Sequence, residues 1–124
     1  MRLHEHADLR VLHLDPDGPV IAAPSDGSQL VGDVLGHGAD MVVVPVSRLD
    51  PEFFRLRSGL AGEILQKLVN YRIRVAVLGD ITDHLQESDA LRAFVGESNR
   101  GTQAWFVPDE AALAERLGPA VEAS

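Results

Sequence analysis

Short apolar runs alternate along the chain with segments in which apolar residues recur every three or four positions. The runs at residues 41–46, 72–78 and 102–107 are rich in β-branched or aromatic residues, which is typical of strands buried on both faces of a sheet. Helical segments separate these runs, so the spacing predicts βαβ units with right-handed crossovers. The pattern therefore predicts an α/β fold with a mainly parallel sheet.

The remaining periodicity predicts four helices. Leu60, Ile64 and Leu68, for example, share one helical face, which should lie against the sheet. Serine or aspartate at a helix start and glycine at a helix end mark the boundaries. The predicted helices are residues 25–35, a segment that follows Ser58, a segment that follows Ser88, and a segment between Asp109 and Gly118.

The amino-terminal region contains a strong turn signal. Two apolar segments, residues 9–14 and 19–22, flank Asp-Pro-Asp-Gly, whose residues suit a tight turn. We therefore expect an N-terminal hairpin over these residues, which brings the sheet to five strands. Residues 1–118 should form a single domain, and residues 119–124 a flexible C-terminal tail.

Composition narrows the possible environments and partners. The 124 residues are enough for one core, and a net charge of -8 disfavours binding to nucleic acid. The chain has no apolar run near the roughly 20 residues that cross a bilayer, so we expect no membrane association. It contains no cysteine, and its polar start lacks a secretory signal, which indicates the cytoplasm.

One basic stretch stands out in this acidic chain. RLRSGLAGEIL, residues 55–65, places Arg55 and Arg57 before a helix start at Ser58 and Gly59. Ser58 is suited to cap the helix, with the arginines in solvent. Alternatively, Arg57, Ser58 and the first helical N–H groups bind a small anion such as phosphate. Both interpretations remain open, because the stretch lacks the Walker A pattern.

Further polar residues follow the predicted strands. Ligands gather beyond the carboxyl ends of parallel strands, which adds Arg48 and Asp80 to Arg57 and Ser58 as candidates for an anion-binding cleft. Asp80 also suits a turn or helix cap. We predict no catalytic residue, because the chain has no Gly-x-Ser-x-Gly elbow and no histidine evidently near Ser58. We expect no cofactor and incline against an enzyme.

Two surfaces are candidates for contact with a protein. Glu63, Gln66 and Lys67 recur on the helix face opposite the apolar stripe, and Asn99 and Arg100 lie near a predicted helix end. Such residues usually keep a helix face solvated. They could instead meet a protein partner or a second copy of the chain, in a homodimer that uses an exposed apolar edge.

The histidines give a weaker signal. His4 and His6 alternate, as metal ligands on a strand do, but they fall in a segment expected to be mobile. His13 is expected on a strand face, and no third ligand for His4 and His6 is evident. The sequence therefore predicts no metal site.

Two stretches carry a family resemblance. SGLAGEILQKLVNYRIRVAVLGD, residues 58–80, and ESNRG, residues 97–101, resemble a bacterial family known as domain of unknown function 4180. The order of predicted elements is also similar to the STAS fold of sulfate-transporter and anti-sigma-factor-antagonist domains. In STAS domains a partner kinase phosphorylates a serine or threonine before Gly-Leu, so the resemblance implies Ser58 as a phospho-acceptor. Arg57 stands where antagonists carry an acidic residue, which implies a different kinase-recognition surface.

These observations lead to two functional hypotheses. The first is a non-enzymatic, STAS-like regulatory or protein-interaction module centred on the Ser58 helix start. The second is a small anion-binding or phosphate-ligand-binding protein or enzyme that uses Arg57, Ser58 and Asp80.

Overall fold

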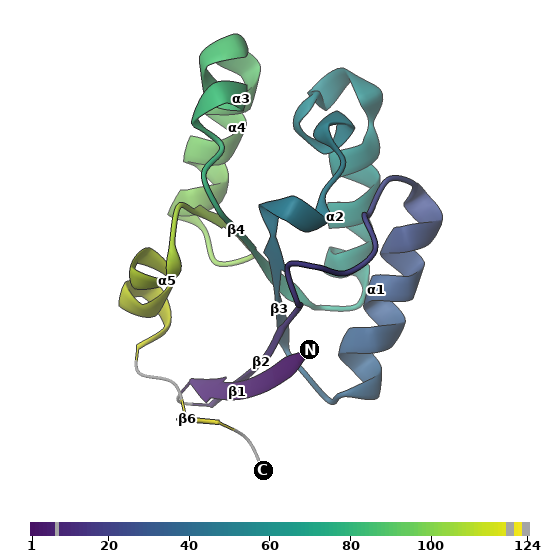
Figure 1. Cartoon of the computed structure of the whole chain (residues 1–124), viewed down its shortest axis with the longest axis vertical. Helices are drawn as coiled ribbons and strands as arrows, with labels where there is room; N and C mark the ends of the chain where they lie inside the picture. The colour runs from purple at the N-terminus through teal and green to yellow at the C-terminus, as the bar shows by residue number, and fades with distance from the viewer. Residues whose placement is uncertain (7, 119–120, 123–124) are drawn as a thin grey trace.

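The computed structural model of the chain describes residues 1–6, 8–118 and 121–122. A single sheet runs through the molecule, with helices on both of its faces (Figure 1). The strands lie in the order β5-β4-β3-β2-β1-β6. Their bounds are β1, Arg2–His6; β2, Leu9–His13; β3, Met41–Pro45; β4, Arg74–Leu78; β5, Ala104–Val107; and β6, Val121–Glu122.

The predicted fold class is confirmed. The pairs β2–β3, β3–β4 and β4–β5 are parallel, whereas β1 pairs antiparallel with β2. To the five expected strands the structure adds β6, which pairs antiparallel with His4 and Glu5 of β1. β6 falls within the segment expected to be a flexible tail, and residues 119–120 and 123–124 of that segment lie outside the described residues.

In the part of the chain that the structure describes, five α-helices surround the sheet. α5 lies on the opposite side of the sheet from α1 and α2 (Figure 1). Three short 3₁₀ helices form the connection between β3 and α2, and no helix in the described part of the chain is long and apolar enough to cross a membrane. The helices are α1, Pro24–Gly36; α2, Leu60–Asn70; α3, Thr82–Glu87; α4, Asp89–Arg100; α5, Glu110–Leu117; and the 3₁₀ helices η1, Val46–Arg48; η2, Pro51–Phe54; and η3, Leu56–Ser58.

The core has two parts, one on each face of the sheet. In β3, Val42 and Val44 belong to the larger cluster, together with residues of α1, α2 and α4. Met41 and Val43 belong to the smaller cluster, which includes Leu113 of α5. Because successive side chains of a strand point to opposite faces, a strand covered on both sides must be apolar throughout. This is why the run at residues 41–46 lacks polar alternation.

The hairpin is present, but its predicted location was wrong. β2 pairs with β1, not with residues 19–22, of which Ile21 makes only an isolated parallel bridge to Leu49. Proline at position 19 has no N–H to donate to a strand ladder. The carbonyls of Asp15 and Pro19 instead accept hydrogen bonds from the Arg48 guanidinium, at 2.8 and 2.7 Å. The turn signal was real, but it marks a connection from β2 towards α1.

The predicted serine cap of α4 is confirmed, and it yields a test of stability. Ser88 Oγ accepts a hydrogen bond from the Leu91 N–H at 3.1 Å. Replacing an N-cap serine by alanine leaves that donor unpaired, so we expect Ser88→Ala to lower the free energy of unfolding by about 1 kcal/mol in urea denaturation. The control is Ser98→Ala in the same helix, because the Ser98 hydroxyl bonds to no described residue. An equal loss in both variants would contradict the cap's contribution.

Candidate functional site

Ser58 lies just before α2 and joins it to the preceding 3₁₀ helices. α2 begins at Leu60, and its N-cap is Gly59, which has a φ of 79°. The prediction that Ser58 is the N-cap was therefore wrong by one residue, because the left-handed backbone at this junction favours glycine. Ser58 Oγ still accepts from the Leu60 N–H at 3.2 Å, and it donates to the Glu52 carbonyl at 2.7 Å. The serine is exposed, and its hydroxyl ties η2 to the start of α2.

The two arginines of this junction differ in their pairing. Arg55 forms an ion pair with Glu52 at 2.8 Å, so its charge is partly neutralised. Arg57 is exposed and makes no hydrogen bond or ion pair with any residue that the structure describes. Of the two arginines, Arg57 is therefore the one whose guanidinium is available to bind a negatively charged group.

A groove of about 400 Å³ opens beside these arginines. Aromatic stacking joins its two sides, since the rings of Phe54 and His84 lie 4.4 Å apart with an interplanar angle of 17°. The groove thus combines apolar and aromatic surface with charged groups of both signs. We call it the Arg57 groove; its lining residues are Pro51, Phe54, Arg55, Leu56, Arg57, His84, Glu87, Ser88 and Ala90.

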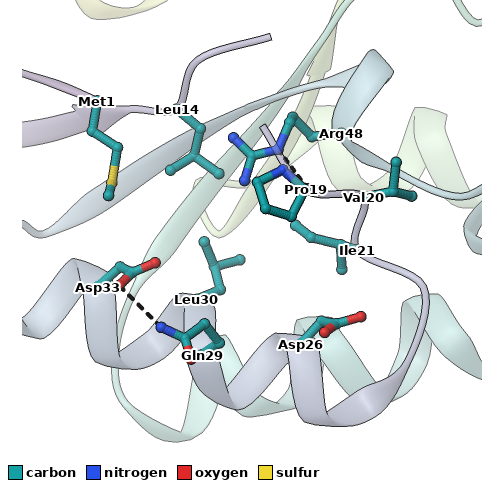
Figure 2. A pocket seen from close by; sticks show the side chains of 10 residues that line it. All are labelled: Met1, Leu14, Pro19, Val20, Ile21, Asp26, Gln29, Leu30, Asp33 and Arg48. Atoms are coloured by element: carbon teal, nitrogen blue, oxygen red, sulfur yellow. Dashed lines mark hydrogen bonds between the residues drawn. The ribbon is translucent and has the colours of Figure 1, made fainter. Parts of the chain in front are cut away.

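The structure does not bring Arg48 and Asp80 into this groove. Arg48 lines a different pocket, of about 290 Å³, beside α1 (Figure 2), and Asp80 lines neither. Asp80 Oδ1 accepts from the Thr82 hydroxyl and N–H at 2.5 and 2.9 Å, and these bonds lower the pKa of the Asp80 carboxyl. Asp80 therefore stabilises the turn before α3, which is one of the alternatives that the sequence left open.

The polar groups of the Arg48 pocket are largely bonded to the chain itself. Asp26 on α1 accepts from the N–H groups of Ala22 and Ala23, at 2.9 and 3.0 Å, and these bonds lower its pKa. Figure 2 shows Gln29 bonded to Asp33 on the same helix, while Arg48 turns its guanidinium to Pro19. The bonded groups leave this pocket a weaker candidate for a charged ligand than the Arg57 groove.

The predicted interaction face on α2 is only partly free. Lys67 donates to the Ser28 hydroxyl at 2.8 Å and so links α2 to α1. Gln66 is bonded to Asn70 on its own helix at 2.9 Å, and Glu63 is exposed. These residues border a shallow depression, so the face remains a surface candidate in which Lys67 also has a structural role.

Asn99 and Arg100 also have partners within the fold. The Asn99 side chain accepts from the Phe106 N–H at 2.7 Å and donates to the Phe106 carbonyl at 3.2 Å. It thereby occupies the outer edge of β5 as a neighbouring strand would. Arg100 forms an exposed ion pair with Glu97 at 2.7 Å. Asn99 thus stabilises the sheet edge, which sequence reasoning did not indicate.

Three histidines gather where no metal site was expected. One ring nitrogen from each of His4, His6 and His13 lies within 4.8 Å of those from the other two. Sequence reasoning missed the group because the segment that holds His4 and His6 was taken as mobile, whereas it forms β1. The signal that could have revealed it is the alternation Arg-Leu-His-Glu-His, which puts both histidines on one face of a strand next to His13.

Comparison with known proteins places the chain in a family. The family model described as Domain of unknown function (DUF4180) matches residues 6–117. The chain belongs to the DUF4180 family. No curated protein and no solved structure shows a significant match to it. The matched region of this DUF4180 protein contains the Arg57 groove, Ser58, His6 and His13, whereas His4 precedes it.

Two arrangements of side chains in the described part of the DUF4180 chain are suited to bind a ligand. At the Arg57 groove an unpaired guanidinium lies beside apolar surface and an exposed seryl hydroxyl, which suits the binding of a negatively charged partner. At the β1–β2 hairpin, imidazole nitrogens converge, which suits the binding of a metal ion. The description of the DUF4180 family names no activity, so function has to be argued from these geometries.

Proposed function

We propose that this protein is a non-enzymatic regulatory module that binds a partner protein through the Arg57 groove and the adjacent Ser58. The observation that carries the proposal is the exposed Arg57 guanidinium, which bonds to no described residue and borders a groove with aromatic walls. The expected partner segment carries a carboxylate or a phosphorylated side chain next to an apolar residue.

The chemistry of the groove supports a protein partner. Interfaces are enriched in arginine and aromatic residues, and the strongest contacts combine a buried apolar anchor with a paired charge. Pro51, Leu56 and Ala90 supply accessible apolar surface. Arg57 supplies a fork of donors that matches a carboxylate or phosphate. The alternative anion site that uses Asp80 is disfavoured, because Thr82 already occupies that carboxylate.

Ser58 supplies a means of regulation. Its hydroxyl is exposed and donates to the Glu52 carbonyl. A phosphorylated serine has no hydroxyl proton, so the bond to Glu52 would be lost. The phosphate would lie at the positive end of α2 and beside Arg57, where its charge is favoured. Phosphorylation would thus loosen the contact with η2 and occupy the cation that the proposed partner needs.

A matched pair of arginine variants tests the proposal. Arg57→Ala removes the groove cation, and Arg72→Ala removes another exposed arginine, which follows the far end of α2. Wild type and both variants are immobilised, exposed to lysate of the source organism, and compared by quantitative mass spectrometry. We expect a partner that wild type and Arg72→Ala retain and that Arg57→Ala loses at least about tenfold, which corresponds to about 1.4 kcal/mol.

The same experiment can refute the proposal. If both variants capture the same proteins in the same amounts, the groove does not bind a partner through Arg57. Peptides that contain Ser58 are examined for phosphate in protein isolated from the source cells. Binding of the purified partner to Ser58→Asp and Ser58→Ala, measured by calorimetry, then tests the regulatory step, and equal affinities would contradict it.

A further inference from the structure

The antiparallel pairing of β1 and β2 gathers three histidines on one face of the sheet. His4 and His6 alternate along β1, and the register pairs Arg2 with His13 and His4 with Val11, which places His13 diagonally across from His4. The ring centroids of His4 and His13 lie 4.6 Å apart, and that of His6 lies 6.3 and 6.2 Å from them. This is the same face that α5 covers.

Two of these imidazoles are buried without a bonding partner. His6 and His13 are each 6% exposed. The Nε2 atoms of both lack a hydrogen-bond partner among the residues that the structure describes. Buried polar atoms are nearly always bonded, because desolvation without a partner is unfavourable. Two such atoms in one cluster therefore point to a ligand that the described residues do not supply.

The hydrogen bond of His6 fixes which nitrogen is available. Its Nδ1 lies 3.1 Å from the carbonyl oxygen of Gly118, just after α5. A carbonyl only accepts hydrogen bonds, so Nδ1 carries the proton and Nε2 keeps its lone pair. Metal-bound histidines commonly donate their second N–H to a carbonyl or carboxylate in this way, which orients the ring. His6 is thus held in the tautomer that a metal ion needs.

The surroundings leave room for an ion and further ligands. The three histidines border a pocket of about 290 Å³ under α5, whose walls include Arg2 and Glu110. The pocket is therefore lined by imidazole groups together with a carboxylate, which is a further potential ligand.

We propose that His4, His6 and His13 together bind one divalent transition-metal ion, with Zn²⁺ as the best match. Imidazole nitrogens suit zinc and its neighbours in the first transition series, whereas Mg²⁺ and Ca²⁺ prefer oxygen ligands. Zinc bound to three histidines leaves one tetrahedral position open to water or a further ligand. The pocket that the histidines border is also lined by Glu110, whose carboxylate is a candidate for that further ligand.

The required adjustment is small. In a tetrahedral zinc site with bonds of about 2.0–2.1 Å, the ligand nitrogens lie about 3.3 Å apart. Here they lie within 4.8 Å of one another, so small ring rotations would bring them to the ion. His4 is only half-buried, and its side chain is therefore the one that can move most easily.

Zinc binding by the untagged protein tests the proposal. After chelator treatment, the full chain is titrated with ZnCl₂ by calorimetry, and its thermal unfolding is followed with and without zinc. We expect one zinc per chain, a dissociation constant of about 1 µM or tighter, and a raised Tm. Co²⁺ should bind competitively and give the visible absorption bands of a tetrahedral site, whereas Mg²⁺ should leave the Tm unchanged.

Histidine variants identify the ligands. His4→Ala and His13→Leu should weaken zinc binding at least about 100-fold, whereas the exposed His37, replaced by alanine, serves as the control and should keep wild-type affinity. Circular dichroism confirms that each variant is folded, and the half-buried His4 provides a ligand test that does not disturb the core. Absence of zinc binding by the folded wild type, or undiminished binding by His4→Ala, would overturn the site.

Discussion

Replacement of Asn99 by alanine is expected to lower the free energy of unfolding by about 2–3 kcal/mol. The Asn99 amide makes two hydrogen bonds to the backbone of Phe106 on the outer edge of β5. Alanine leaves a partly buried N–H and carbonyl without that partner, at a cost of about 1–3 kcal/mol for each unpaired group. The better helix propensity of alanine in α4 offsets a small part of the loss.

Urea denaturation measures this effect, and a neighbouring residue supplies the control. Glu97→Ala removes an exposed ion pair with Arg100 from the same turn of α4. Exposed pairs contribute little, so this variant should remain within about 0.5 kcal/mol of wild type. If Asn99→Ala is as stable as Glu97→Ala, the amide does not stabilise the sheet edge.

Acidification of the metal-free protein from pH 7 to pH 5 is expected to lower its stability by about 1–2 kcal/mol. His13 has a pKa of about 4 in the folded protein, against 6.5 ordinarily, chiefly because it is buried. Between these values the unfolded chain binds a proton that the folded chain does not. Stability is therefore fully present above pH 6.5 and declines as the pH falls towards 4. Because the ring borders an open pocket, solvent screening makes the effect smaller than the full shift implies.

Between pH 5 and pH 7 the effect of His13 protonation on stability can be distinguished from that of Asp26 and Asp80. Hydrogen bonds lower the pKa of the Asp26 and Asp80 carboxyls, so their contributions to stability are lost only at more acidic pH. The groups that face His13 are Arg2, His4 and His6 of β1 and Glu110 of α5. His13→Leu should flatten the pH dependence of denaturant unfolding between pH 5 and 7. The same decline in this variant would assign the effect to another group.

The parallel part of the fold could be predicted because local and global requirements agree there. A strand covered by helices on both faces needs apolar residues on both, and the run from Met41 to Val44 meets that requirement. Ser88 and Asp109 each accept a hydrogen bond from a backbone N–H of the helix that follows. Each of these signals involves only a few adjacent residues, so it can be recognised without knowledge of the tertiary structure.

β1 could not be found in that way, because its stability depends on distant contacts. Leu3 is its apolar residue that packs against the larger core cluster, and its remaining side chains are polar. The strand forms because β2 and β6 pair with it and because α5 lies over its histidines. The polar sequence of β1 does not indicate that β2, β6 and α5 contact it. The metal-site hypothesis therefore needed the structure, although all three ligands are visible in the sequence.

The candidate site residues show a related limit. The rule that ligands gather at the carboxyl ends of strands nominated Arg48 and Asp80, but it does not determine where their side chains point. Arg48 turns to the carbonyls of the preceding loop, and Asp80 turns to Thr82. Backbone groups that need a partner compete for polar side chains. Arg57, which bonds to no described residue, is left unpaired by that competition.

The hydrogen bond between His6 Nδ1 and the Gly118 carbonyl joins residues 112 positions apart. The two groups are therefore synthesised at different times. The hairpin that carries the three imidazoles is synthesised before α5 and before the Gly118 carbonyl that orients His6. A nascent chain would therefore display these histidines to the cell's metal pool before their cover exists. Metal that arrives after synthesis must instead enter through the pocket under α5, so the timing of zinc supply would decide the route by which the ion is loaded.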